Sequence, residues 1–451
     1  MYRPNKIIVV GGNAAGPAAA AKAKRINRKA EVTLFEAGDF ISTGTCELPY
    51  LFSKTIDDYS KLIFFSPEKF LKEKGVKVYT NHLVKKINRK NKELLIYDKR
   101  NDKEFYCSYD RLILTTGSKA KELPELPFSI ENVFAFKAVS DYIKINKYIS
   151  QNNIKNILII GSGYIGLELS DTLTKAKFNI TLLEKEELPL PSSDEEIRHL
   201  ILEIIKQKEI RFLKNSSTTK FIIKNNKFFQ LKNEGRYLDL AIVAIGVKPN
   251  VELAKKSALK IGNKNGLVTC KKLKTNDPNI YAAGDNIEVK NFITGKYDYM
   301  PLATYAHKQG HIAGTNAAGG NEFIEDVVLN VTFKFFDNFV AKVGLTFEQA
   351  KQHFFNIDSV SSVTINKVKI MPCSRKVFGK IIFNKDNNLI LGASFIGGEE
   401  VSGFSDIIST CIHNKIPAEN LARINYNYTP TLSPFINLLS ILGRKILEKT
   451  K

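Results

Sequence analysis

The feature that most constrains the fold of this chain is a long-range internal repeat. Residues 7–12 (IIVVGG) and 157–163 (ILIIGSG) are apolar strands that run into glycine turns, about 150 residues apart. A helix rich in alanine or leucine follows each turn, and a second strand then ends in a glutamate, at Glu36 and Glu184. Two such βαβ units predict a duplicated α/β architecture built on parallel sheets.

The length of the chain and a change of pattern near residue 325 predict a third unit. For 451 residues, roughly two to four domains are expected. Alternating residues at 327–335 and 380–383 indicate antiparallel strands, and the stretches at 403–414 and 435–449 indicate helices. The last third is therefore predicted as a separate α+β domain, whose final amphipathic helix packs on the core or on a partner subunit rather than on a membrane.

The net charge of +21 suggests a nucleic-acid partner, but the distribution of the charge argues against one. The basic residues are mostly lysine and are spread along the whole chain, without an aromatic-basic RNA motif, a zinc pattern or a basic arm. We interpret them as a solvated surface that would speed the encounter with a polyanionic substrate. No run of 18 apolar residues occurs, so no membrane span is expected.

The five cysteines are odd in number and lack CxxC spacing, which argues against a disulfide scaffold and a zinc site. A reducing cytoplasm fits this pattern best, and no metal is expected. Cys107, Cys270, Cys373 and Cys411 suit the ordinary role of a small buried apolar residue. Cys46 differs, because it follows the first βαβ unit beside a helix start, where a thiolate is stabilised.

The first glycine turn has the spacing of a dinucleotide-binding site. Gly11 supplies the backbone angles of the turn, Gly16 allows helix and strand to approach closely, and the free N–H groups of the helix would face a pyrophosphate. Glu36, 25 residues beyond Gly11, is placed to bind ribose hydroxyls. The residues predicted to line this turn are Gly11, Gly12, Asn13, Ala14, Ala15 and Gly16, with Asn13 in place of the usual middle glycine.

The second glycine turn carries the full pattern in 161–166 (GSGYIG). Glu184, 23 residues beyond Gly161, is placed to accept a hydrogen bond from a ribose 2′-hydroxyl and to repel a 2′-phosphate, which favours NADH over NADPH. Lys185 beside it weakens that preference. The residues predicted to bind this second nucleotide are Gly161, Gly163, Tyr164, Ile165, Gly166, Glu168, Glu184 and Gly246.

Two further strand ends are predicted to line the first nucleotide site. The segment 275–285 (TNDPNIYAAGD) ends in Gly284 and Asp285, and the strand before them is apolar. Glycine permits close approach there, and the aspartate is able to accept hydrogen bonds from a polyol hydroxyl. An earlier apolar strand ends in the same way, at Thr116 and Gly117.

Together these segments resemble the pyridine nucleotide-disulfide oxidoreductases, and within them the single-cysteine group that includes coenzyme A-disulfide reductase, NADH oxidase and NADH peroxidase. The resemblance covers nearly the whole chain. It is carried by 109–117 (YDRLILTTG), 243–250 (VAIGVKPN), 280–285 (IYAAGD) and 300–310 (MPLATYAHKQG).

The resemblance implies two Rossmann-like domains and a C-terminal α+β dimerisation domain. FAD would bind a discontinuous domain at 1–120 and 247–324, NAD(P)H would bind 121–246, and the dimerisation domain would span 325–451. This last domain would form a homodimer and close the active site of the neighbouring subunit.

The resemblance also implies how FAD lies in the first site. Its ribityl chain would rest on Asp285. Leu302, Ala303 and Thr304 would lie near the pyrimidine end of the isoalloxazine.

Cys46, in 41–50 (ISTGTCELPY), matches the redox cysteine of the single-cysteine group, whose segment is usually Cys-Gly-Leu-Pro-Tyr. Here Glu47 replaces the glycine, and a carboxylate beside a thiolate tends to raise its pKa. Relatives with an internal redox pair carry CxxxxC, but Ile41 and Leu51 stand at the matching positions. Cys46 is therefore predicted to cycle between a thiolate and either a mixed disulfide or a sulfenate.

These two fates of the thiol separate the candidate functions. In the family, NADH oxidases and peroxidases carry a histidine in the first glycine turn, where this chain has Ala14. The coenzyme A-disulfide reductases instead carry basic residues on the first helix, and Lys22, Lys24 and Arg25 match them. With Ser42 these are the predicted substrate residues, and a solvated helix face is the alternative for the three basic ones.

The leading interpretation is an FAD-dependent NAD(P)H reductase of a coenzyme A-type disulfide or of a per- or polysulfide. Tyr428, in 426–434 (YNYTPTLSP), would donate a proton. Thr429 stands where relatives with paired cysteines have histidine, which argues against their acid–base chemistry. Two alternatives are an NADH oxidase or peroxidase that uses a Cys46 sulfenate and a slow-turnover flavoprotein with a binding or signalling role.

Overall fold

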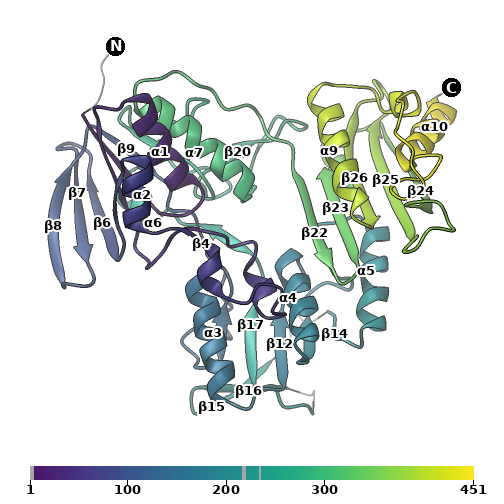
Figure 1. The fold of residues 1–451 in the computed structure, drawn as a ribbon, viewed down its shortest axis with the longest axis horizontal. Coiled ribbons are helices and arrows are strands. Elements are labelled where there is room, and N and C mark those ends of the chain that lie inside the picture. The colour runs from purple at the N-terminus through teal and green to yellow at the C-terminus, as the bar shows by residue number, and fades with distance from the viewer. Residues whose placement is uncertain (1–4, 216–219, 233–234, 451) are drawn as a thin grey trace.

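The computed structural model describes residues 5–215, 220–232 and 235–450. The first four residues of the predicted FAD-binding domain and the last residue of the predicted dimerisation domain lie outside them. Within the described ranges the chain contains three five-stranded sheets, each at the centre of one unit. Figure 1 shows the first unit at the upper left, the second below it and the third at the upper right.

The first unit is built on a parallel sheet that the chain completes in two visits. Its strand β1 is buried from Ile7 to Val10, as expected for a parallel sheet with both faces covered. Its last strand in sequence joins after the whole second unit, so the unit is discontinuous. In spatial order the strands are β19 (Ile280–Ala282), β9 (Arg111–Leu114), β1 (Lys6–Val10), β2 (Glu31–Phe35) and β5 (Lys77–Tyr79).

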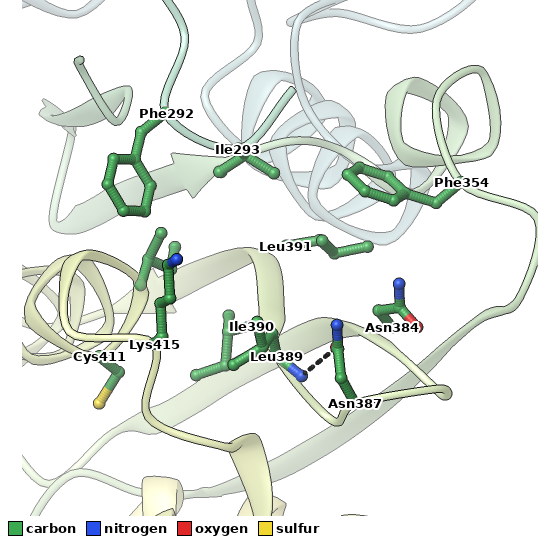
Figure 2. A pocket seen from close by; sticks show the side chains of 11 residues that line it. Phe292, Ile293, Phe354, Asn384, Asn387, Leu389, Ile390, Leu391, Cys411 and Lys415 are labelled. Carbon is green, nitrogen blue, oxygen red and sulfur yellow. Dashed lines mark hydrogen bonds between the residues drawn. The ribbon is translucent and has the colours of Figure 1, made fainter. Parts of the chain in front are cut away.

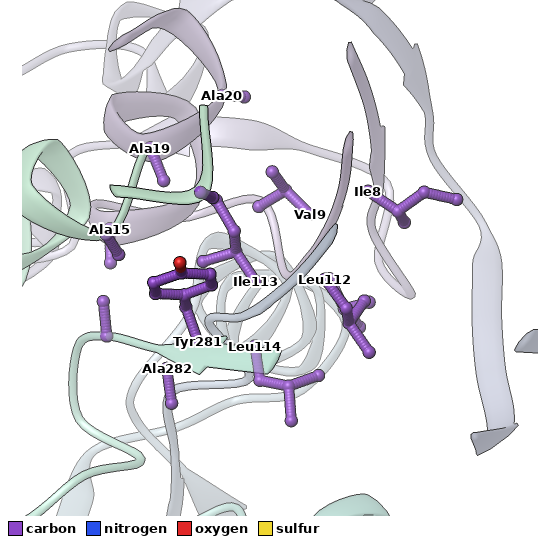
Figure 3. Packing of buried hydrophobic residues seen from close by; sticks show 14 of the residues in the cluster. Ile8, Val9, Ala15, Ala19, Ala20, Leu112, Ile113, Leu114, Tyr281 and Ala282 are labelled. Carbon is purple, nitrogen blue, oxygen red and sulfur yellow. The ribbon is translucent and has the colours of Figure 1, made fainter. Parts of the chain in front are cut away.

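Two helices of this unit, α1 (Ala15–Ile26) and α7 (Ala303–Ala317), pack closely against each other. A Cβ at Gly310 would lie 2.3 Å from the carbonyl oxygen of Ala15, so only glycine fits there. Ala15 shares a buried cluster with Ile113 of the sheet (Figure 3). The alanine-rich composition of α1 is therefore explained by the closeness of α7 and of the sheet.

Smaller elements surround this sheet. They are α2 (Pro67–Lys74), α6 (Glu252–Lys256), an antiparallel sheet of β6 (His82–Asn88), β7 (Glu93–Asp98) and β8 (Lys103–Ser108), and the short pair β20 (Val289–Lys290) and β21 (Tyr297–Asp298). Cys46 lies between β3 (Ile41–Thr43) and the 3-10 helix η1 (Leu48–Leu51); η2 (Tyr59–Leu62) and β4 (Ile63–Phe65), the partner of β3, follow.

The second unit repeats the first. Its sheet is also parallel, with the strand order β11 (Val133–Ala135), β17 (Leu240–Val243), β12 (Asn156–Ile160), β13 (Asn179–Leu183) and β14 (Arg211–Leu213). The strand that enters each glycine turn, β1 or β12, is central in its sheet, which agrees with the predicted duplication. The other elements are α3 (Val139–Gln151), α4 (Tyr164–Lys175), α5 (Glu195–Gln207), and the hairpin of β15 (Phe221–Lys224) and β16 (Lys227–Leu231). The ribbon of β10 (Ser118–Ala120) and β18 (Val247–Pro249) joins the two chain segments that run between the units.

The third unit is the predicted α+β domain. Its antiparallel sheet has the order β22 (Asn330–Phe335), β23 (Asn338–Gly344), β26 (Ile390–Gly397), β25 (Lys376–Asn384) and β24 (Ile357–Ile365). The two predicted helices are present as α9 (Glu400–His413) and α10 (Leu438–Thr450), with α8 (Phe347–Lys351) and the 3-10 helix η4 (Ala418–Ala422) besides. Leu442 and Ile446 of α10 are fully buried, so the last helix packs on the core as expected.

The two faces of this third sheet differ in polarity. Ala341 and Val343 belong to the apolar core under α9 and α10. Lys342, between them, points to the other face, where it stands in register with Ser394, and Ser394 with Lys380. This polar row faces the second unit and contacts the segment before α5.

Asp194 of the second unit fills the centre of that row. Its carboxylate accepts a hydrogen bond from Ser394 Oγ at 2.6 Å and lies 3.5 Å from Lys380 Nζ. The backbone N–H of Phe347 donates to the same carboxylate at 2.9 Å. A buried ion pair with this many hydrogen bonds fixes the second unit against the third.

A hollow of about 250 Å³ lies in the third unit beside α9. Figure 2 shows Phe292, Phe354 and Leu391 around it, with Asn387 and Lys415 at its edges. No predicted site residue lines it. Among the described residues no helix is long and apolar enough to cross a membrane, and no cluster of His, Cys, Asp or Glu is placed to hold a metal.

Candidate active site

The two glycine turns have the same backbone geometry. Gly11 and Gly161 adopt φ values of 111° and 97°, a region that favours glycine. A Cβ at Gly16 would lie 1.8 Å from the Gly11 carbonyl oxygen, and one at Gly166 would lie 1.9 Å from that of Gly161. Only glycine therefore fits at positions 16 and 166, and this allows each helix to begin close to the end of its strand.

The helix that follows each turn begins without a side-chain cap. Ala14 precedes α1 and Gly163 precedes α4, and neither side chain accepts a hydrogen bond from its helix. The first N–H groups of α4 are therefore available to a ligand. In α1 the N–H of Gly16 donates instead to the carbonyl of Asn13 at 2.9 Å and Pro17 has no N–H, which leaves the N–H of Ala15 to face a ligand. A Cβ at Gly163 or at Gly117 would meet nothing within 4 Å, so both positions face open space. These features fit a pyrophosphate at each turn.

The two strand-end glutamates bind their own turns in different ways. Glu36 accepts hydrogen bonds from the N–H groups of Gly12 and Gly38, both at 2.6 Å. A carboxylate has about four acceptor sites, so Glu36 retains capacity for ribose hydroxyls.

Glu184 is buried, and its carboxylate already accepts four bonds. They come from Ser162 N at 2.9 Å, Ser162 Oγ at 2.6 Å, Lys185 N at 2.8 Å and Glu186 N at 3.2 Å. A ribose hydroxyl would therefore have to replace one of them, most simply the Ser162 hydroxyl. The sequence pattern gave no sign of this competition.

The strand ends that were predicted to line the first site lie together. β9 and β19 pair in parallel, so Thr116 and Gly117 are beside Gly284 and Asp285. Thr116 Oγ1 donates to the carbonyl of Asn250 at 2.6 Å, which ties this edge to the returning chain. Leu302 immediately precedes α7, and Ala303 and Thr304 are exposed at its first turn.

Asp285 has two polar neighbours that the sequence pattern missed. Ser118 Oγ donates to its carboxylate at 2.7 Å, and Lys137 Nζ lies 3.6 Å away. Tyr299 is half-buried nearby; desolvation and the charge of Asp285 raise its pKa, and a hydrogen bond with Ser118 opposes that shift. Lys137 comes from the second unit, so no local motif in the sequence points to it.

Asn13 connects the first turn to the cysteine segment. Its Oδ1 accepts hydrogen bonds from Thr43 N at 3.2 Å and Thr43 Oγ1 at 3.3 Å. Ser42, with φ of 51°, donates its N–H to the carbonyl of Gly12 at 2.8 Å. The asparagine that departs from the glycine consensus thus helps to place the chain that leads to Cys46.

The Cys46 thiol is accessible at the meeting point of the first two units. Its pKa is raised, chiefly by desolvation and next by the carboxylates of Glu47 and Glu168, while Lys137 acts in the opposite direction. Glu47 is close by in space as well as in sequence, because its carboxylate folds back against Gly44.

Glu168 is the most perturbed carboxyl group in this neighbourhood. It lies on α4, where burial and the charge of Asp171 raise its pKa to about 7 and a hydrogen bond with Tyr50 opposes the shift. Desolvation and Glu168 together raise the pKa of Tyr50 to about 12. Cys46, Tyr50 and Glu168 therefore form one electrostatically coupled group, and sequence reasoning had assigned Glu168 to the nucleotide alone.

Of the three basic residues predicted to meet the substrate, two remain available. Lys24 Nζ donates to the carbonyls of Arg28 at 2.9 Å and Ala30 at 2.8 Å, where it completes the end of α1. Arg25 is exposed, and Lys22 lies 3.7 Å from Glu322.

Lys22 and Arg25 share their surface with two histidines. The rings of His307 and His311 on α7 are 4.6 Å apart. Burial, His307, Lys22 and Arg25 lower the pKa of His311, which shows that these groups are near one another. The cluster is cationic and contains two flat rings.

Tyr428 is not brought to Cys46 within one chain. It is 49% exposed in the third unit, and its ring packs edge-on against Phe435 at 5.6 Å. α10, which follows it, lies on the far side of the molecule from α1 and β4 (Figure 1).

The expectation that four cysteines are buried was wrong for three of them. Cys411 is buried under the third sheet, but Cys270 and Cys373 are exposed and Cys107 is half-buried. A cysteine outside a recognisable motif has no neighbours in sequence that report its burial. All five described cysteines are free thiols, so no disulfide joins Cys46 to another.

We expect the substitution Glu47→Gln to lower the pKa of Cys46, because among the charges that oppose the thiolate Glu47 has the largest effect. The pH dependence of iodoacetamide alkylation, followed by peptide mass spectrometry on Cys46, measures this directly. The midpoint should move to lower pH, and Glu348→Gln, an exposed carboxylate on α8, should leave it in place. An unchanged or higher midpoint in Glu47→Gln would contradict the electrostatic assignment.

Comparison with known proteins identifies the family to which this chain belongs. Residues 5–310 match the model of the pyridine nucleotide-disulphide oxidoreductases, and residues 331–438 match that of their dimerisation domain. A protein of Methanocaldococcus jannaschii named NADH oxidase is 30% identical over 98% of this chain and 99% of its own length. A Pyrococcus furiosus protein named NAD(P)H sulfur oxidoreductase (CoA-dependent) is 29% identical over 97% of this chain and 98% of its own.

A solved structure gives the same result in three dimensions. The reduced CoADR-RHD of Bacillus anthracis, at 28% identity, superposes with a TM-score of 0.94 over 100% of this chain and 81% of its own. The glycine turns, the coupled thiol and these similarities lead to one conclusion. The chain belongs to the pyridine nucleotide-disulphide oxidoreductase family and is an FAD-dependent NAD(P)H oxidoreductase.

Proposed function

We propose that this enzyme reduces a coenzyme A-type disulfide, or a per- or polysulfide of the same thiol, through Cys46. The observation that carries the proposal is the accessible Cys46 thiol, which is not paired with another described cysteine. A lone thiol of this kind accepts the substrate's sulfur as its own disulfide partner. The names of the relatives from P. furiosus and B. anthracis support coenzyme A as the thiol, although those names describe those proteins.

The cationic cluster supports a substrate that carries phosphates. Lys22 and Arg25 offer N–H donors to phosphate oxygens, and charge-assisted bonds of this kind are the strong ones. The rings of His307 and His311 offer flat surfaces on which a nucleotide base is able to stack. Ser42, the middle residue of β3 and four residues before Cys46, completes the proposed substrate residues. Lys24 is left out because its ammonium already binds the carbonyls at the end of α1.

In the proposed reaction two electrons and two protons convert one disulfide into two thiols, and Cys46 is regenerated. The Cys46 thiolate attacks one sulfur of the disulfide, forms a mixed disulfide and releases the first thiol as a thiolate that takes up a proton. Two electrons then cleave the mixed disulfide, which restores the Cys46 thiolate and releases the second thiol. Bound FAD supplies the route by which these electrons arrive from NAD(P)H.

We assign the residues that would hold the two nucleotides from their positions. FAD would be held by the turn at 11–16, by Glu36, by the edge formed by Thr116, Gly117, Gly284 and Asp285, and by Leu302, Ala303 and Thr304 at the start of α7. NAD(P)H would be held by Gly161, Gly163, Tyr164, Ile165 and Gly166, with Glu168, Glu184 and Gly246. NADH is the proposed coenzyme, because a 2′-phosphate near the buried carboxylate of Glu184 would be repelled.

A homodimer would complete the site. We propose that the domains at 1–120 with 247–324 and at 121–246 bind the nucleotides and that the domain at 325–451 dimerises. In the dimer, Tyr428 of the partner subunit would donate the proton to the departing thiolate, since within its own chain it is far from α1 and β4. Glu47 would tune the pKa of Cys46 rather than contact the substrate.

The first test is the mass of the purified protein before and after treatment with a reductant, with peptide mapping of Cys46. We expect one coenzyme A on Cys46 that the reductant removes, and none on the four other cysteines or on the Cys46→Ser variant. Added oxygen on Cys46 without a thiol adduct would contradict the proposal and favour a peroxidase or an NADH oxidase; the M. jannaschii relative carries the second of these names.

The cationic cluster gives a second prediction. Lys22→Gln combined with Arg25→Gln should raise KM for coenzyme A disulfide roughly tenfold or more, because a charge-assisted hydrogen bond to phosphate is lost at each position. Turnover at saturation should change little, and reduction of a small uncharged disulfide should not change at all. Lys29→Gln, exposed beyond the end of α1, is the control. An equal rise in KM for both substrates would show that the cluster does not bind the phosphates of the substrate.

Mixed dimers test the role of Tyr428. Tyr428→Phe should lower turnover on the order of a hundredfold, as for loss of a general acid. Chains with Cys46→Ser and with Tyr428→Phe, unfolded and reassembled together, should regain about a quarter of the native activity, because half of the dimers are mixed and each has one intact site. Activity that stays at the level of the two parent proteins would mean that each site is built from one chain.

A further inference from the structure

Tyr164 is held in one orientation at the edge of the second glycine turn. It is the first residue of α4, so its backbone N–H is one of those at the helix start that the proposed coenzyme would meet. The ring packs edge-on against Phe333 of β22, with centroids 5.2 Å apart. Its hydroxyl accepts a hydrogen bond from Ser192 Oγ at 3.2 Å. A tyrosine of the second unit is thus fixed by contacts with the third sheet and with the segment that precedes α5.

Ser192 is held in turn by Lys342 of the third sheet. Lys342 Nζ donates to the carbonyl of Ser192 at 2.5 Å and to Gln349 Oε1 at 3.3 Å. Gln349 is itself fixed, because it forms a capping box with Thr346 at the start of α8. The chain of contacts therefore runs from a rigid sheet through Ser192 to the hydroxyl of Tyr164.

Lys342 differs from the other lysine of the polar row. It is 3% exposed, and desolvation lowers its pKa to about 8, yet it forms no ion pair among the described residues. Lys380, two strands away, instead lies 3.5 Å from Asp194 and 2.9 Å from Glu196. A buried ammonium is costly unless its partners compensate. The charges of Asp194 and Asp298 offset part of this cost, but the groups that Lys342 Nζ contacts directly are the carbonyl of Ser192 and Gln349 Oε1, so its ammonium is held at Ser192 rather than at a carboxylate.

We propose that Lys342 is a positioning residue for the nicotinamide coenzyme: through Ser192 it holds Tyr164 against Phe333 and so keeps the second glycine turn ready for binding. The inference rests on the proposal that NAD(P)H lies on this turn. Without the contact, Tyr164 is free to rotate, and coenzyme binding must order it again. Ordering one side chain of this size corresponds to roughly a threefold to tenfold increase in Kd.

The experiment measures coenzyme binding to the oxidised holoenzyme, with NAD⁺ and NADP⁺ titrated in turn by calorimetry. Lys342→Met keeps the length of the side chain and removes the donor. We expect a threefold to tenfold higher Kd, while the limiting rate of flavin reduction at saturating NADH stays within about twofold of the native rate. A general loosening of the fold would lower that rate as well.

Ser192→Ala provides an independent variant at an exposed position, which keeps the test decisive if Lys342→Met does not fold. It removes the hydroxyl that holds Tyr164 and should raise Kd by a similar factor. In the double variant the two effects should not multiply, because both act through Tyr164. Factors that multiply, or a native Kd in Ser192→Ala, would overturn the proposed path.

Two controls distinguish the proposed role of Lys342 from the proposal that the coenzyme binds at the second glycine turn. Lys380→Met, in the same row, should lower thermal stability without changing Kd, since Lys380 does not lead to Tyr164. Gly163→Ala places a methyl group in the open space at the turn and should weaken binding. If Gly163→Ala binds as well as the native enzyme, the coenzyme site itself is wrong. If Gly163→Ala is weakened and Lys342→Met is not, only the role of Lys342 is overturned.

Discussion

The close approach of helix to strand at the two glycine turns is the constraint on which the rest of the molecule depends. A Cβ at Gly16 or Gly166 would lie within 2 Å of the carbonyl oxygen that ends the preceding strand turn. Each helix must therefore begin at the carboxyl edge of its sheet and direct its free N–H groups there. Asn13 links this turn to the cysteine, because its side chain binds Thr43 and so positions the segment that leads to Cys46.

The raised pKa of the Cys46 thiol follows from its position between the first and second units. Cys46 stands between units, so desolvation and the carboxylates of Glu47, Glu168 and Asp285 oppose its ionisation while Lys137 favours it. Glu168 has a pKa of about 7, so its charge changes within the physiological range. When Glu168 takes up a proton, one of the charges that oppose the Cys46 thiolate is removed, while burial and Glu47 continue to oppose it.

Much of this arrangement was predictable because it is local. The turns, the strand-end glutamate Glu36 and the order of the three units follow from glycine spacing and hydrophobic periodicity, which depend on near neighbours in sequence. The roles of Lys137 and Tyr50 near Cys46 were not predicted, because residues from separate elements meet around this thiol only after the units pack. The burial predicted for Cys270 and Cys373 was wrong for the same reason: a lone cysteine carries no local signal of its surroundings.

The third unit exposes apolar side chains that a single chain does not cover. One face of its sheet is covered by α9 and α10, and the other holds the second unit through Asp194 and the polar row. Large apolar side chains nevertheless remain exposed beyond the sheet, among them Ile370 at 88% and Phe435 at 81%. Where such side chains lie together, they mark a surface that another protein covers. Both lie in the part of the chain that matches a dimerisation domain, and Phe435 packs against Tyr428, so a partner that covered Phe435 would also cover Tyr428.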